Sequence, residues 1–253
     1  QGKAFLTTGP TTEDIREFKT NNAMRPIRVY VGMRSRETPE ERAKLALAEL
    51  KRAGGFERSV LVVATPTGTG WLDPSAVGPL EYLHGGDTAI VGIQYSYLPS
   101  WITLLVDPKC SIESAIALFD EIYSHWKSLP ASSRPRLYLH GLSLGSLGSE
   151  RSLDLLTDFE DPIHGPVWSG PPFPSQRWQL IVENRNESSP AWVPKFRDQR
   201  IVRFTAQENA LDTARPWGAM RFVYVQYASD PMIWFSPDLA WVRPDWLPSN
   251  PDQ

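Results

Sequence analysis

Two residues of this chain have the type and spacing that acyl-transfer chemistry requires, and Ser143 is the first. It lies in Gly141-Leu142-Ser143-Leu144-Gly145, directly after the apolar segment 136–140 and before a helix-like segment. A serine between two glycines on such a strand-to-helix turn is presented as a nucleophile. The backbone N–H of Leu144 is expected to donate a hydrogen bond to the oxyanion that forms when Ser143 attacks a carbonyl.

Asp230 is the second residue, and it is the expected acid of the same site. It follows the apolar segment 221–226, and catalytic groups gather where the strands of an open parallel sheet end. The expected chain order is serine, acid, histidine, so Asp230 would orient a histidine. An alternative is that Asp230 only caps the turn at Pro231.

No histidine of the chain fits the third role. Three of the four precede the serine, and the fourth precedes the acid; they are His84, His125, His140 and His164. His164 also comes just before a predicted strand, at the end away from the catalytic edge. The third role therefore stays unfilled within this sequence.

The turn 65–71 is the expected second half of the oxyanion hole. It follows the apolar segment 59–64, and its glycines allow backbone N–H groups to approach a substrate oxygen. Thr67 and Gly68 are the predicted donors. The turn lacks the Gly-Lys-Ser/Thr ending of a phosphate-binding loop. The carboxylates show no metal-ligand spacing, so neither a metal nor a cofactor is expected.

Aromatic side chains near the expected strand ends favour an apolar substrate. Trp71, Trp168 and Trp234 are the predicted substrate contacts. The alternative is that these side chains fill the core.

Composition and periodicity predict the scaffold that positions these residues. The 253 residues carry a net charge of −3 and one cysteine, which gives no electrostatic basis for nucleic-acid binding and excludes a disulfide framework.

Strand-like and helix-like segments alternate, which predicts an α/β fold: a mostly parallel sheet with helices on both faces. The clearest helices begin at Thr38 and span about 112–126. The predicted strands are 27–31, 59–64, 89–94, 136–140, 165–168, 201–204 and 221–226. We expect a single domain over 1–253, with a possible cap or lid at about 171–215.

Several long motifs together resemble one protein family. They include Arg28-Val29-Tyr30-Val31-Gly32, the run from Ala64 to Trp71, Gly86-Asp87-Thr88-Ala89, Gln94 to Trp101, Ser143-Leu144-Gly145-Ser146, and Ala228-Ser229-Asp230-Pro231 with Trp234 and Ser236-Pro237-Asp238-Leu239. The chain resembles, from about residue 10 to residue 246, the bacterial membrane-associated α/β-hydrolases. These join an N-terminal multi-helix membrane region to a C-terminal hydrolase domain.

The resemblance implies an α/β-hydrolase sheet with Ser143 as the nucleophile. It also implies one more strand and a histidine after this sequence, and membrane attachment through a region absent from it. The chain departs from the family pattern at Leu142, where an acidic residue is usual, and at Tyr227, often a histidine.

Three functions follow as hypotheses. The first is a serine hydrolase or acyltransferase acting on a lipophilic ester, and the second is a non-catalytic module that binds a lipid or a partner protein. The third uses Asp230 or Tyr227 for non-hydrolytic acid–base chemistry. Substrate, oligomeric state and membrane sidedness do not follow from the sequence.

Overall fold

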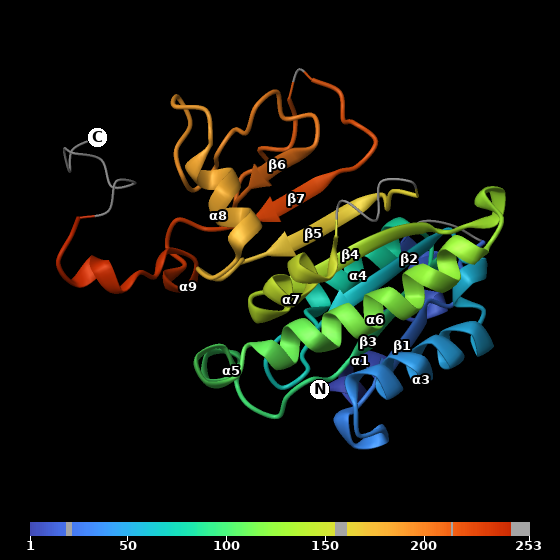
Figure 1. Ribbon diagram of the computed structural model, residues 1–253. Coiled ribbons are helices and arrows are strands. Elements are labelled where there is room, and N and C mark those ends of the chain that lie inside the picture. Colours follow the sequence, from blue (N-terminus) through green and yellow to red (C-terminus); the bar gives the residue numbers. More distant parts are fainter. Residues whose placement is uncertain (19–21, 155–160, 214, 244–253) are drawn as a thin grey trace.

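The fold is built on one parallel sheet. The computed structural model describes residues 1–18, 22–154, 161–213 and 215–243. Within these residues seven strands pair in the order β1-β3-β2-β4-β5-β7-β6, and every pairing is parallel (Figure 1). The strands are β1 (Ile27–Val31), β2 (Val60–Thr65), β3 (Thr88–Ile93), β4 (Arg136–Leu142), β5 (Gly165–Ser169), β6 (Val202–Thr205) and β7 (Phe222–Val225). The expected mostly parallel sheet is confirmed.

Helices cover both faces of this sheet, as expected. They are α1 (Gly2–Thr7), α2 (Thr12–Phe18), α3 (Pro39–Arg52), α4 (Pro74–Leu83), α5 (Ser100–Val106), α6 (Lys109–Ser128), α7 (Leu144–Ser152), α8 (Gln176–Glu183) and α9 (Pro231–Trp234). Helices α3 and α6 lie in front of the sheet in Figure 1, and α4 lies behind it. The parallel strands β2 and β3 are buried along their whole length, which explains why both read as continuous apolar runs.

Local signals in the sequence fix where α3 begins and ends. Thr38 accepts a hydrogen bond from the Glu41 N–H, and the Glu41 side chain accepts one from the Thr38 N–H, which makes a capping box. Pro39 occupies the first helical position, where its missing N–H costs nothing. After Ala53, Gly54 adopts a φ of 75° that ends the helix.

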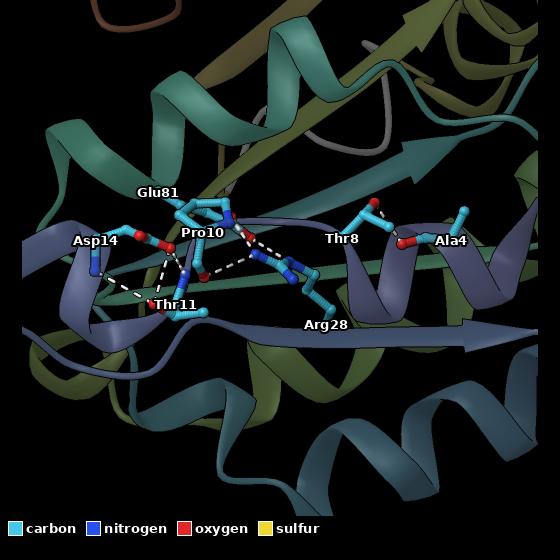
Figure 2. Close-up of polar contacts among 7 residues, drawn as sticks. All are labelled: Ala4, Thr8, Pro10, Thr11, Asp14, Arg28 and Glu81. Atoms are coloured by element: carbon cyan, nitrogen blue, oxygen red, sulfur yellow. Dashed lines mark hydrogen bonds and ion pairs between the residues drawn. The ribbon is translucent and has the colours of Figure 1, made fainter.

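A buried ion pair joins β1 to α4, and its arginine also contacts the connection between α1 and α2. Arg28 of β1 forms two hydrogen bonds to Glu81 of α4, with Nε–Oε1 at 2.6 Å and Nη2–Oε2 at 2.5 Å. Figure 2 shows that the same guanidinium reaches the Pro10 carbonyl between α1 and α2. Thr11 and Asp14 cap the start of α2 reciprocally. Neither α1 nor α2 was predicted from the sequence.

The outer end of the sheet has a non-sequential order. Strand β7 pairs with β5 on one side and with β6 on the other, so β6 forms the edge. The segment 171–215 contributes α8 and this edge strand, and its predicted role as a cap or lid stays a prediction. Within the described residues, no helix has both the length and the apolar character needed to cross a bilayer.

Candidate active site

Ser143 lies on a strained turn between β4 and α7. Its φ of 53° and ψ of −124° are unusual for a residue with a side chain. Four hydrogen bonds hold the turn: the Ser143 N–H donates to the Ser169 carbonyl at 2.8 Å, and the Ser143 carbonyl accepts from the Ser146 N–H and hydroxyl and from the Leu147 N–H. Because a strained backbone persists only where its surroundings fix it, these contacts keep the half-buried Ser143 side chain at the carboxyl end of β4.

The glycine at 145 allows the turn 65–71 to approach Ser143. A Cβ at Gly145 would lie 2.3 Å from the Thr65 carbonyl oxygen and 2.6 Å from that of Pro66. A Cβ at Gly141 would similarly meet the backbone of Gly145 at 2.4 Å. The two glycines therefore allow the serine turn and the end of β2 to pack backbone against backbone.

The expected oxyanion donors have different surroundings. Leu144 is the first residue of α7, so its N–H has no carbonyl partner within the helix. The Thr67 N–H donates to the Trp71 carbonyl at 2.9 Å, and the Gly68 N–H donates to the Tyr95 hydroxyl at 2.9 Å. The Thr67 hydroxyl is buried and interacts with the Tyr95 hydroxyl, although no hydrogen bond of ordinary geometry joins it to another described residue. The prediction of backbone donors at Thr67 and Gly68 finds no support, since both N–H groups are engaged.

Tyr95 is a residue of the site that the sequence did not single out. Burial raises the pKa of its phenol well above the ordinary value, so the hydroxyl stays protonated. It contacts Ser111, whose hydroxyl donates to the Leu144 carbonyl at 3.1 Å. Tyr95 and Ser111 therefore connect the turn 65–71 to the start of α7. The only signal for this in the sequence is the position of Tyr95 just after the third strand.

Asp230 lies at the end of β7 and caps α9. Its Oδ1 accepts from the Met232 N–H at 2.9 Å, which agrees with the capping alternative. Its Oδ2 faces the end of β5, where a Cβ added at Gly170 would lie 3.4 Å away. Because the Ser143 N–H bonds Ser169 at the same strand end, Asp230 and Ser143 lie at neighbouring carboxyl ends of the sheet. The Asp230 carboxylate therefore lies beside the end of β5, the strand whose Ser169 carbonyl accepts from the serine turn.

All four histidines lie away from the Ser143 turn or have other contacts. His140 is buried, its Nδ1 lies 3.0 Å from the Val167 carbonyl, and its Nε2 is buried without a partner. Burial lowers the pKa of His140, so the ring is neutral. His164 accepts from the Leu137 N–H at the opposite end of β4, and His125 packs edge-on against Phe56. His84 follows α4, four residues before β3 begins, and so lies at the amino edge of the sheet.

The three predicted substrate tryptophans have three different environments. Trp168 is fully buried, and its Nε1 donates to the Ser149 hydroxyl, so packing accounts for it and its predicted substrate contact finds no support. Trp234 is half-buried against Trp178, with its Nε1 bonded to the Tyr227 carbonyl. Trp71, at the end of the turn 65–71, is exposed.

A cavity of about 590 Å³ lies between α4 and the strands β2 to β5. Leu142, His140 and Tyr227 line it together with apolar side chains such as Val167 and Val225. Within the described residues, no group of three or more histidine, cysteine, aspartate or glutamate side chains is arranged to hold a metal ion.

Comparison with known proteins identifies relatives of the chain. The profile of a family described as "Alpha/beta-hydrolase family" matches residues 27–253. No curated protein matches the chain. Among solved structures, a Trichoderma reesei cutinase in complex with a C11Y4 phosphonate inhibitor is similar, with a TM-score of 0.39 and 16% sequence identity. The alignment covers 77% of this chain and 75% of the cutinase chain.

Proposed function

The chain belongs to the alpha/beta-hydrolase family, and from this premise we propose that it is a serine hydrolase or acyltransferase acting on a lipophilic ester. The observation that carries the proposal is Ser143, which lies at positive φ at the carboxyl end of a central strand and whose backbone makes four hydrogen bonds. A turn that only connects a strand to a helix can form without backbone strain. A nucleophilic serine whose hydroxyl must project from the end of the sheet is typically found on such a strained turn.

The proposed reaction assigns one role to each residue of the site. The Ser143 hydroxyl attacks the ester carbonyl, its proton passes to a histidine base, and the base then protonates the leaving alcohol. Water or a second alcohol resolves the acyl-enzyme. The Leu144 N–H and the Thr67 hydroxyl stabilise the oxyanion. Asp230 orients the base through the oxygen that faces Gly170.

The base itself is a histidine that we place outside this sequence, because the four described histidines lie elsewhere. This placement follows the family resemblance, as do the bacterial and membrane-associated setting and the attachment through a region outside this sequence. The lipophilic character of the substrate is proposed from the apolar side chains at the same edge of the sheet.

A second function is favoured by one specific observation. The cavity behind the serine turn is mostly apolar, and His140 next to it has an unpartnered Nε2. A non-catalytic module that binds a lipid or a partner through this cavity would need neither Ser143 nor Asp230.

Covalent labelling separates the two functions. The protein is incubated with a long-chain alkyl fluorophosphonate, with and without imidazole as a diffusible base, and the adduct is located by peptide mass spectrometry. We expect one adduct on Ser143, formed faster as the concentration of neutral imidazole rises, and none in Ser143→Ala. If no adduct forms where a known serine hydrolase reacts fully, the catalytic proposal is wrong and the binding function is favoured.

A further inference from the structure

Helix α5 is apolar on its outer face as well as its inner face. On the inner face Thr103 and Leu104 are buried, and Leu104 packs with Tyr95, Leu144 and Leu147. On the outer face large apolar side chains are exposed over one short stretch of chain. They are Trp101, Leu105 and Val106 of α5, with Tyr97 and Leu98 just before the helix, and together we name them the α5 patch; Leu105 and Val106 are 69% and 72% exposed.

The α5 patch is free of charge. Residues 88–106 include no aspartate, glutamate, lysine, arginine or histidine. A helix that is apolar on all sides is normally buried, and a continuous exposed apolar patch marks an interaction site. Protein–protein interfaces carry roughly one hydrogen bond per 100–200 Å², whereas this patch has few polar groups with which to form them. An uncharged apolar patch is best matched by an uncharged apolar environment such as the acyl chains of a lipid bilayer.

The position of the patch relates it to the candidate active site. A Cβ at Gly68 would lie 2.7 Å from the Ser100 nitrogen, so the start of α5 contacts the oxyanion turn directly. A second exposed apolar stretch, with Phe235, Leu239, Trp241 and Val242, follows Asp230 and α9. Figure 1 places α5 and α9 at the edge toward which the strands β5, β6 and β7 point. Exposed apolar side chains therefore flank the Ser143 edge of the sheet on two sides.

We propose that the α5 patch docks this edge of the molecule onto the surface of a phospholipid bilayer. Leucine and valine side chains enter the acyl region, while tryptophan and tyrosine rings lie at the headgroup level. The docking is independent of anionic lipid, because the patch has no cationic side chain to attract it. If the proposed function is correct, on which this step rests, the docked enzyme takes its ester substrate from the same lipid bilayer.

Vesicle flotation tests the docking directly. The protein is mixed with phosphatidylcholine vesicles at low and high salt, and the bound fraction is measured. We expect binding that is unchanged by salt and by Ser143→Ala. In Leu105→Asp the partition coefficient should be at least about tenfold lower, since an apolar side chain is lost from the acyl region and a charge is introduced. Leu180→Asp is the matched control, because Leu180 is 58% exposed on α8, outside the patch; it should bind like the wild type.

Other results would overturn the inference. One is absence of binding by the wild type, and another is equal binding by Leu105→Asp. A third is that the wild type sediments as a dimer and does not bind vesicles, while Leu105→Asp sediments as a monomer. That result would show that the patch binds a second copy of the chain. Circular dichroism confirms that each variant is folded. Vesicle binding does not require Ser143, so the two proposals can fail separately. If the protein binds vesicles but Ser143 is not labelled, only the proposed function is contradicted. If Ser143 is labelled but the protein does not bind vesicles, only the bilayer docking is contradicted.

Discussion

At the scale of single residues, the buried hydroxyl of Thr67 is the donor that we propose for the 65–71 turn. Both neighbouring N–H groups already donate, to the Trp71 carbonyl and the Tyr95 hydroxyl. We therefore expect Thr67→Val to slow phosphonylation of Ser143 by about 100-fold, the usual effect of losing one oxyanion donor. Thr67→Ser keeps the hydroxyl and should react nearly as the wild type does.

The stability of the same variants distinguishes this role from a structural one. The Thr67 hydroxyl has no hydrogen bond of ordinary geometry among the described residues, so Thr67→Val should unfold at nearly the same urea concentration as the wild type. A slow reaction with unchanged stability supports the donor role. Equal rates for the valine and serine variants would leave Leu144 as the donor and contradict the role of Thr67.

A second residue-scale prediction concerns the close packing at Gly145. Gly145→Ala places a Cβ against two backbone carbonyls, which cannot move aside as a side chain can. We expect a loss of about 1–3 kcal/mol or more in the free energy of unfolding, together with loss of Ser143 labelling. Gly78→Ala on α4 is the control, because a Cβ there meets nothing within 4 Å. It should stabilise the protein by roughly 0.5–1 kcal/mol through helix propensity.

At the scale of elements, the Arg28–Glu81 pair joins β1, α4 and the loop between α1 and α2 (Figure 2). The Glu81 side chain is fully buried, and burial raises its pKa although Arg28 opposes the shift. Arg28→Met would leave a buried carboxylate without its partner, and we expect a loss of about 3–5 kcal/mol in the free energy of unfolding.

The double variant tests whether the pair or the packing stabilises this junction. Arg28→Met with Glu81→Leu replaces both charges by apolar groups, and such replacements are often neutral or stabilising. We expect chemical denaturation to show that most of the loss is recovered. If the double variant is as unstable as Arg28→Met alone, the ion pair is not what joins the elements.

At the scale of the whole molecule, the sequence predicts the parallel sheet, and long-range contacts decide the rest. Helix α3 and the Ser143 turn carry their own local signals, namely a capping box and paired glycines. The placement of β6 outside β7 depends on which strands meet after long connections, and no local pattern encodes it. Likewise, the engagement of the Gly68 N–H depends on Tyr95, a residue 27 positions away. Trp168 is buried because α7 and α8 cover its face of β5, whereas Val167 on the other face is exposed.

The response of overall stability to pH depends on another such long-range contact, at Glu150 of α7. One carboxylate oxygen accepts from the Arg177 N–H on α8 at 2.9 Å, and the other lies 3.0 Å from the Tyr224 hydroxyl on β7. Burial is the largest influence on this group and raises the pKa of Glu150 above its ordinary value of 4.5. The folded state therefore holds this proton more tightly than the unfolded chain does.

The sign of the effect follows from that difference. The contribution of Glu150 to stability is greatest below pH 4.5 and falls as pH rises through the raised folded pKa, above which it stays constant. Glutamine keeps an acceptor but does not titrate, so Glu150→Gln should gain stability relative to the wild type as pH rises above 4.5. Glu49→Gln is the control of opposite sign, because Arg52 lowers the pKa of exposed Glu49. The Glu49 contribution changes below pH 4.5 and the Glu150 contribution above it, so urea denaturation at a series of pH values on both sides of 4.5 measures both differences. A Glu150→Gln difference that is flat or falls with pH would show that the carboxylate is ionised in the fold at no cost.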